Sequence, residues 1–328
     1  MRVTLRDVAE QAGVSVATVS RAFRRPGMVS QEARDKILEI STQLGYQPAR
    51  NGREIPHGST GVLGVIVPDL LNPFYPALLK GAQSRGREHG VQLLLADAEE
   101  APDGELPLVE TLASQVDGIL LCSSRMTDTS LEQAAELTRL CLVNRYHPAL
   151  TSVSADALSG VRGAVRHLAA LGHRRIGYVG GPRPSRSDIE RRLALDEVGA
   201  ELEVEIVDVG HYRPSIEGGS TAGEAVLLHE LRAVMVYNDV MALGLISGLR
   251  TFGFEVPGDI SVVGWDDIEF APVSSPALST VRVSRHRMGA VGIDALLGPD
   301  HAVTQQKLET HFVPRDSTSR ASRPAVRS

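Results

Sequence analysis

The sequence predicts an α/β protein with a small three-helix head and a larger core of two lobes, each built on a parallel β-sheet. The first 46 residues contain three short amphipathic stretches of helical period. Residues 47–60 hold prolines and glycines with little apolar content, which is typical of a linker. Beyond Gly61, short β-branched runs alternate with helix-length stretches. About eight to ten strands are too many for one compact sheet in a core of this size, so we expect two lobes.

Each helix of the head has a recognisable start. Thr4, Ser15 and Ser30 stand at expected N-cap positions, because their hydroxyls can accept from free backbone N–H groups of the first turn. Gly13 and Gly45 are placed to end the first and third helices. The predicted buried faces are Leu5, Val8, Ala9 and Ala12, then Val19, Ala22 and Phe23, then Ala33, Ile37, Ile40 and Leu44.

The core alternates strands with amphipathic helices, a pattern that places helices on both faces of parallel sheets. Polar residues follow where the apolar strands stop, and ligands of such folds bind outside the carboxyl ends of the strands. The predicted strands are 62–68, 91–97, 116–122, 139–144, 175–180, 204–210, 233–239 and 261–267, with helices over 73–89, 156–171, 187–199 and 239–252. The polar strand ends are Asp69, Asn144-Arg145, Asn238-Asp239 and Asp266-Asp267.

Charge and composition narrow the class of protein. The net charge is −6, but residues 1–50 carry +3 and the remainder −9. A basic head on an acidic body suits a protein that touches phosphate at one end only. No segment approaches 18 continuous apolar residues and no secretory signal is recognisable, so we expect a cytoplasmic protein without a membrane span. Cys122 and Cys141 match no ligand spacing, which favours buried free thiols over a disulfide.

The head has the pattern of a DNA-reading helix-turn-helix. A Gly-containing turn joins the first helix to a short second helix that starts with the small residues Ser15 to Thr18. Thr18, Ser20 and Arg21 offer hydrogen-bond donors for phosphates or base edges. Periodicity alone does not exclude the alternative that these residues form a three-helix bundle without a nucleic-acid role.

At these residues the sequence resembles the lactose-repressor (LacI/GalR) family. The runs TLRDVAEQAGVSVATVSRAF (4–23) and VSQEARDKILEISTQLGYQP (29–48) look like that family's DNA-binding head. The likeness continues through GVIVPDLLNPFY (64–75), VDGILL (116–121), HLAALGHRRIGYVGGP (167–182), NDVMALG (238–244) and VPGDISVVGWDD (256–267), and so spans almost the whole chain.

The resemblance implies a dimeric transcriptional regulator, most often a repressor, with a core similar to periplasmic sugar-binding proteins. Its double-stranded operator would be nearly palindromic, and a small-molecule effector would close the core and change operator affinity. The implied domains are a head (1–48), a hinge (49–60) and a sensing core (61–315), followed by a tail (316–328) that we expect to be disordered. The N-lobe would comprise about 61–155 plus 282–315, and the C-lobe about 156–281.

By position, the resemblance assigns DNA contacts to the head and the hinge. Val16 and Ala17 would meet bases, with Arg21 contacting base or backbone, and because the first two are small and apolar, hydrogen-bonded readout would depend on Arg21 and the hinge. Ile55 would take the wedge position in the minor groove. Gly52 and Pro56 are poor helix residues, costing about 1 and 3 kcal/mol, so we expect a weaker hinge helix. The implied phosphate contacts are Thr4, Ser15, Thr18 and Ser20.

The resemblance also implies a ligand cleft between the lobes. Acidic, amide and arginine side chains would bind sugar hydroxyls, and an aromatic ring would contact the sugar face. Individually, Asp69 and Asp266 could be helix N-caps and Arg191 a solvated charge. Arg285, near the lobe crossover, could favour a phosphorylated ligand or form a salt bridge, and a corepressor-dependent regulator sensing a nucleobase or phosphorylated metabolite is the alternative. The implied cleft residues are Asp69, Asn72, Phe74, Ser187, Arg191, Tyr212, Asn238 and Asp266.

An enzyme is the rival class, and the sequence argues against it. The run GYVGGP (177–182) lacks the dinucleotide-loop spacing, and the histidines accompany no nucleophile or metal-ligand pattern. We expect His173 to end a helix, where a positive charge suits the helix dipole. We therefore expect no catalysis, no cofactor and no metal. An exported binding protein with the same core would lack the head.

Overall fold

The computed structural model describes residues 4–24, 26–44, 46, 59–298 and 303–321. The chain forms two compact units, one over the first 58 residues and the other over most of the chain from Ser59 onward. No helix in the described part is long and apolar enough to cross a membrane.

The head is a three-helix unit, as predicted: α1 (Leu5–Ala12), α2 (Val16–Arg24), a short 3₁₀ turn (Pro26–Met28) and α3 (Gln31–Leu44). Thr4 starts α1 through a reciprocal capping box with Asp7. Gly13 ends α1 in the left-handed conformation, with φ of 69°, a geometry that glycine adopts without strain. The predicted end of α3, Gly45, lies outside the described residues. The helices share a core of Val8, Ala9, Ala12, Val19, Ala22 and Ile37.

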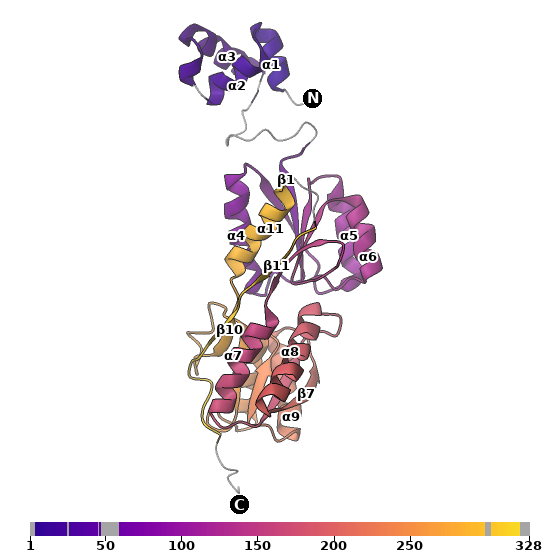
Figure 1. The fold of residues 1–328 in the computed structure, drawn as a ribbon, viewed down its shortest axis with the longest axis vertical. Coiled ribbons are helices and arrows are strands. Elements are labelled where there is room, and N and C mark those ends of the chain that lie inside the picture. Colours follow the sequence, from indigo (N-terminus) through magenta and orange to yellow (C-terminus); the bar gives the residue numbers. More distant parts are fainter. Residues whose placement is uncertain (1–3, 25, 45, 47–58, 299–302, 322–328) are drawn as a thin grey trace, which may run out of the picture. The chain divides into compact units, whose positions relative to one another are not determined.

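The N-lobe is a six-stranded parallel sheet (Figure 1). Helices α4 (Phe74–Glu88) and α11 (Arg285–Leu297) pack on one face. Helices α5 (Pro102–Ala113) and α6 (Asp128–Leu137) pack on the other. In spatial order the strands are β11 (Gln305–Leu308), β5 (Thr151–Ala155), β4 (Leu140–Val143), β3 (Ile119–Cys122), β1 (Val62–Val67) and β2 (Gln92–Asp97).

The C-lobe repeats this architecture around a second six-stranded sheet. Helices α7 (Ala157–Ala170) and α8 (Arg186–Leu202) cover one face, and α9 (Ile216–Leu228) and α10 (Asp239–Thr251) cover the other. Only β12 runs antiparallel to its neighbour. The strand order is β12 (His311–Val313), β10 (Ser279–Arg282), β9 (Ser261–Asp266), β8 (Ala233–Val236), β6 (Arg175–Gly180) and β7 (Glu205–His211).

The chain passes between the lobes three times: from β5 to α7, from β10 to α11, and from β11 to β12. Two of these crossovers are hydrogen-bonded together, because Asp156 N–H donates to the Leu308 carbonyl at 2.8 Å and the Thr310 hydroxyl donates to the Asp156 carbonyl at 2.8 Å. The second part of the N-lobe was expected to cover residues 282–315, and its end is wrong. Strand β12 pairs with β10 in the C-lobe, so the returning chain has left the N-lobe by residue 311.

Both cysteines are free and buried, as predicted. They lie on the paired strands β3 and β4, where Leu120 stands opposite Cys141 and Cys122 opposite Val143. Burial raises the pKa of both thiols, which keeps them protonated at neutral pH.

The expected disorder of the tail is wrong for residues 316–321. Ser317 is fully buried, and its hydroxyl donates to the Val262 carbonyl at 2.6 Å. The Ser319 carbonyl lies 3.0 Å from Nε2 of His173, which is 4% exposed. Hydrophobic periodicity misses this segment because polar side chains and backbone groups hold it. His173 was also misread: burial lowers its pKa, so it is a neutral ring under the tail and not a charge at a helix end.

The buried His173 predicts that stability falls in mild acid. Its folded pKa lies below the ordinary value of 6.5, so as pH falls the unfolded chain binds the proton first and the free energy of unfolding decreases. Urea midpoints measured at pH 7.5 and pH 5.5 should therefore differ, and His173→Gln should reduce that difference. The exposed His229 supplies a control, because His229→Gln should leave the difference unchanged. Equal pH dependence in His173→Gln and the parent protein would contradict this account.

Candidate functional site

The second helix of the head presents a solvent-facing surface while its other face is buried. Val19 and Ala22 pack inward, whereas Val16, Ala17 and Arg21 are exposed. Val16 is 43% exposed, although an apolar side chain at the start of a helix gains nothing from water. Two small apolar side chains could contact thymine methyl groups in a major groove, and the guanidinium beside them could donate to base edges or phosphates.

Hydroxyl groups surround the start of this helix. The Ser15 hydroxyl accepts from the Thr18 N–H at 3.1 Å, which makes Ser15 the N-cap of α2, and it lies 2.8 Å from the Thr18 hydroxyl. Ser20 is partly exposed on the same helix. These hydroxyls and the helix amino terminus are suited to hold phosphate oxygens. The predicted wedge residue Ile55, with Gly52 and Pro56, lies outside the described residues.

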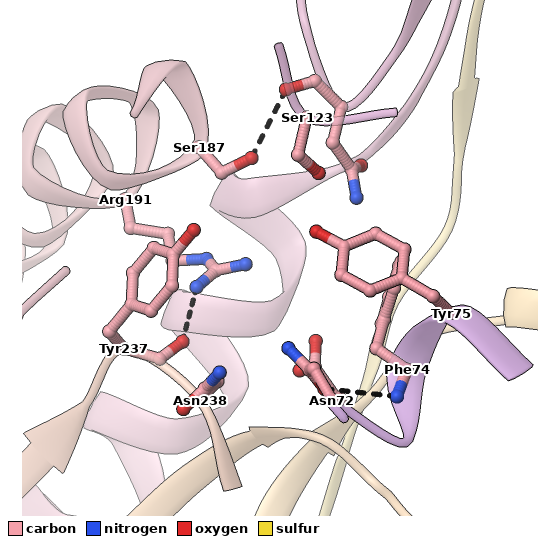
Figure 2. Close-up of a pocket in the computed structure, with 10 residues that line it drawn as sticks. Asn72, Phe74, Tyr75, Ser123, Ser187, Arg191, Tyr237 and Asn238 are labelled. Atoms are coloured by element: carbon pink, nitrogen blue, oxygen red, sulfur yellow. Dashed lines mark hydrogen bonds between the residues drawn. The ribbon is translucent and has the colours of Figure 1, made fainter. Parts of the chain in front are cut away.

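The core contains a polar pocket at the carboxyl ends of its strands, lined by both lobes (Figure 2). The space between its lining residues, which is open to solvent, amounts to about 270 Å³. Six of the residues that line it were predicted from the sequence: Asn72, Phe74, Ser187, Arg191, Asn238 and Asp266. Four were not: Tyr75, Ser123, Asn144 and Tyr237.

The N-lobe contributes an aromatic wall. Asn72 accepts from the Phe74 backbone N–H at 3.0 Å and so fixes the turn that starts α4. The rings of Phe74 and Tyr75, the first two residues of that helix, meet edge to face with centroids 5.2 Å apart. An aromatic surface beside polar groups suits a ligand with one apolar face and several hydroxyls.

The C-lobe contributes a fixed cation. The Arg191 guanidinium lies over the ring of Tyr237 at 4.8 Å and over that of Trp265 at 4.2 Å, and it donates to the Tyr237 carbonyl. Arg191 is only 7% exposed, so the alternative of a solvated helix charge is wrong. Stacking on two rings leaves the guanidinium little freedom, which preorganises it for a ligand.

Two further C-lobe groups have unused hydrogen-bonding capacity. The Asn238 Oδ1 caps α10 by accepting from Met241 N–H at 2.9 Å, but its buried Nδ2 has no partner among the described residues. Leaving a buried donor unpaired costs about 1–3 kcal/mol, which a ligand acceptor would recover. Asp266 is 5% exposed, and burial raises its pKa to about 7, while Arg191 and Arg285 hold it lower than burial alone would.

Unusual backbone geometry gathers at the same pocket. Ser123, Asn144 and Asp266 each end or follow a strand and have positive φ angles of 48°, 52° and 112°. Such angles are uncommon for residues with a side chain, and strained positions of this kind cluster at ligand sites. The Ser187 hydroxyl donates to the Asn144 carbonyl at 3.2 Å and so connects the two lobes across the pocket.

Comparison with known proteins identifies the chain. Residues 4–49 match the model for bacterial regulatory proteins of the lacI family, and residues 165–318 match a periplasmic binding protein-like domain. The chain is 33% identical to the transcriptional regulator GalS of Salmonella typhimurium over 90% of its own length and 89% of that protein. It belongs to the lacI family. It is also 32% identical to the repressor CytR of Escherichia coli, with the same shares of each chain covered.

Solved structures of lacI-family proteins have the same fold. The lac repressor dimer bound to operator superposes with a TM-score of 0.79 at 26% identity, covering 97% of this chain and all of that one. The regulator CelR in complex with cellobiose gives a TM-score of 0.71 at 28% identity, covering 96% of this chain and all of that one. This lacI-family chain is thus a DNA-binding transcriptional regulator, and the enzyme hypothesis is rejected.

Two residues assigned to the cleft by resemblance lie outside the pocket. Asp69 stabilises the turn after β1, where its Oδ1 accepts from the Leu71 N–H at 2.8 Å. Tyr212 packs beside the C-lobe core, and its hydroxyl donates to the Val209 carbonyl at 3.4 Å. Arg285 takes the salt-bridge alternative: it pairs with Glu269 at 3.4 Å and donates to the Asp267 carbonyl at 2.7 Å.

The four pocket residues that were not predicted have only weak signals of a binding role in the sequence. Tyr75 and Tyr237 lie at the edges of apolar runs, where an aromatic residue indicates core as readily as a binding site. Asn144 was recognised as a polar strand end, but nothing in the sequence placed it in the cleft. Ser123 follows β3 directly, and its position after a strand was the signal available.

Proposed function

We propose that this protein is a repressor whose operator affinity is set by a small polyhydroxylated effector, a sugar or a close relative, bound between the lobes. The observation that carries the proposal is one pocket holding the unpaired amide of Asn238, the carboxyl of Asp266 and the stacked guanidinium of Arg191. A hydroxyl group both donates and accepts, so neighbouring hydroxyls can satisfy such a mixed set. The cellobiose complex of CelR supports this class of ligand.

The effector would act by changing the relative position of the two lobes. Ligand groups that bind Asn72 from one lobe and Arg191 from the other favour the closed arrangement over the open one. Three crossovers connect the lobes, so closure moves them as bodies. Operator affinity then changes because the two arrangements hold the paired heads differently.

A thermal-shift screen with purified protein tests the proposal. Sugars, sugar phosphates, sugar acids and nucleosides are added separately, and a ligand at 100 times its dissociation constant should stabilise the protein by about 2.7 kcal/mol. Hits are retested for operator binding with DNA selected from fragments of the source genome. The proposal predicts a hit among neutral hydroxylated compounds that changes operator affinity. Stabilisation by phosphorylated compounds alone would overturn the choice of effector.

Effector affinity should rise with pH through neutrality. The ionised Asp266 carboxylate is the better acceptor for ligand hydroxyls, and its pKa of about 7 leaves roughly a tenth of it ionised at pH 6. Calorimetric titration of a neutral effector should therefore give about tenfold weaker binding at pH 6 than at pH 8. In Asp266→Asn the two affinities should be equal. A parent protein with no pH dependence would contradict the assigned role.

The proposed regulator is a homodimer that places two heads on one operator. Strand β2 is the edge of the N-lobe sheet and exposes Leu94 and Leu95 by 37% and 40%. An exposed apolar edge strand is a liability that association would cover. The operator-bound lac repressor, a dimer, supports the assembly.

Leu95→Glu should therefore weaken the dimer and, with it, operator affinity, because a buried charge at the interface is costly. Sedimentation velocity should show a monomer at concentrations where the parent is a dimer. Leu137→Glu is the control, since Leu137 is also exposed, by 48%, but on α6. If Leu95→Glu and Leu137→Glu were both monomeric, or both dimeric, the proposal that β2 forms the dimer interface would be contradicted.

A further inference from the structure

Arg285 contacts two loops that carry pocket residues from opposite lobes. It is the first residue of α11 in the N-lobe, and its side chain is 12% exposed. One guanidinium nitrogen donates to the Pro73 carbonyl at 3.4 Å, in the N-lobe turn that precedes Phe74. The other donates to the Asp267 carbonyl at 2.7 Å, in the C-lobe loop directly after Asp266. A single side chain therefore connects the two sides of the pocket.

The N-lobe holds Arg285 in a fixed position. Helix α11 packs so closely on α4 that a side chain at Gly81 would collide with the backbone of His286, and Gly289 makes a similarly close approach to α4. Phe74 is the first residue of α4. Because the two helix backbones are in contact, neither can tilt without moving the other. The aromatic wall of the pocket and Arg285 therefore belong to one rigid part of the N-lobe.

The C-lobe holds Asp267 equally firmly. Its carboxylate accepts from Arg282 on β10 and from Arg315 after β12, both at 2.6 Å. The N–H of Ile268 donates to the buried Asp239 carboxyl at 2.9 Å. Asp267 has a φ of 54°, an uncommon conformation that persists where the surroundings impose it. The bond from Arg285 therefore joins a fixed point of one lobe to a fixed point of the other.

The bond to the Asp267 carbonyl is the main contribution of Arg285 to this connection. It has a charged donor and lies largely away from water, which strengthens it. Glu269 also pairs with Arg285, at 3.4 Å, but its side chain is 65% exposed, so this ion pair contributes little. Loss of a hydrogen bond to a charged group typically changes an equilibrium by about 10- to 150-fold. Arg285 also holds the pKa of the Asp266 carboxyl lower than burial alone would.

We propose that Arg285 is a positioning residue, which joins the Phe74 turn of the N-lobe to the Asp266 loop of the C-lobe before any effector binds. The inference rests on the proposed function for the role of the pocket, and it adds which residue holds the two sides of the pocket together. Without this link, the open arrangement of the lobes gains population. An effector that binds the closed arrangement then binds more weakly, in proportion to the closed fraction that is lost.

The test measures the distance between the lobes by double electron–electron resonance on the full chain, without effector or DNA. Spin labels are attached at Gln133→Cys on α6 and Glu224→Cys on α9, two exposed positions in different lobes. Cys122 and Cys141 are buried, so the labels react at the introduced cysteines. Labelled chains are mixed with an excess of unlabelled chain, so that a dimer contains one labelled subunit.

Arg285→Met should add a population with a longer distance between the labels, because the equilibrium between the two arrangements moves toward the open one. Arg285→Gln should have the same effect, because its amide is uncharged and its side chain is shorter. Arg285→Lys keeps a charged donor and should give a distribution close to that of the parent protein. The melting temperature of each variant verifies that it is folded.

Arg282→Met is the matched control, because Arg282 also binds Asp267 but does so from β10 within the C-lobe. It should reproduce the parental distances. Parental distances in Arg285→Met and Arg285→Gln, or the same change in Arg282→Met, would overturn the role of Arg285. No effector is used, so this result is independent of the thermal-shift screen, which tests the proposed function.

Discussion

Asp266→Ala is expected to weaken effector binding by about 10- to 150-fold and to leave operator binding without effector unchanged. The carboxylate is buried in the pocket, and a hydrogen bond to a charged group contributes about 1.5–3 kcal/mol. Asp266 lies in the core unit, and the residues assigned to DNA lie in the other unit, within the first 58 residues. The measurement is calorimetric titration of the effector together with an operator-binding titration.

Asp69→Ala is the matched control for that experiment. Asp69 also follows a strand, but it accepts from the Leu71 N–H in a turn and lies outside the pocket. The variant should bind effector as the parent protein does. An equal loss in both variants would contradict the geometry of the pocket, and no loss in Asp266→Ala would remove Asp266 from the site.

Arg21→Ala should cost roughly 1–3 kcal/mol of specific operator binding, equivalent to about five- to 150-fold. Arg21 is exposed on the same face of α2 as Val16 and Ala17, which cannot hydrogen-bond to bases. Anisotropy titrations with operator and with scrambled DNA separate the specific loss from the general one. The ratio of the two affinities should fall in Arg21→Ala.

Lys36→Ala is the control, because Lys36 is an exposed cation of the same head but lies on α3. Lys36→Ala should reduce the affinities for operator and for scrambled DNA by the same factor, or reduce neither. The ratio of the two affinities should therefore be preserved. An unchanged ratio in Arg21→Ala would remove this residue from direct readout.

The sequence predicted those helices and strands that are marked by a local capping residue or by a run of buried apolar residues. Thr4, Ser15 and Ser30 begin helices as expected, because capping is a local property of the first turn. Strands β1 and β9 were recognised from continuous apolar runs that are buried on both faces.

Polar elements at the edge of the fold were not predicted, because no hydrophobic pattern marks them in the sequence. Strand β11 reads QQKL and lies at the edge of its sheet, so it has neither an apolar run nor a buried face. The segment around Ser317 is held by backbone and hydroxyl hydrogen bonds with partners far away in the sequence. Hydrophobic periodicity cannot detect either kind of contact.

The pocket was predictable in part. Asn72 and Arg191 were assigned to the cleft by their position in the family resemblance, and Asp266 was also recognised as a polar residue at the end of a strand. Tyr212 was assigned by position alone, but it packs on the C-lobe core, while Tyr237 provides an aromatic ring in the pocket. Which of two nearby tyrosines faces a cleft depends on packing that one sequence does not encode locally.

The central claim is that occupancy of the core pocket controls the affinity of the head for DNA. The most direct test measures operator affinity by fluorescence anisotropy with and without saturating effector, in the parent protein and in Asp266→Ala. The account predicts a change of about five- to 150-fold in the parent, the usual range of allosteric coupling, and in the variant the same change only at effector concentrations about 10- to 150-fold higher. A ligand that stabilises the parent protein but leaves its operator affinity unchanged would contradict the account.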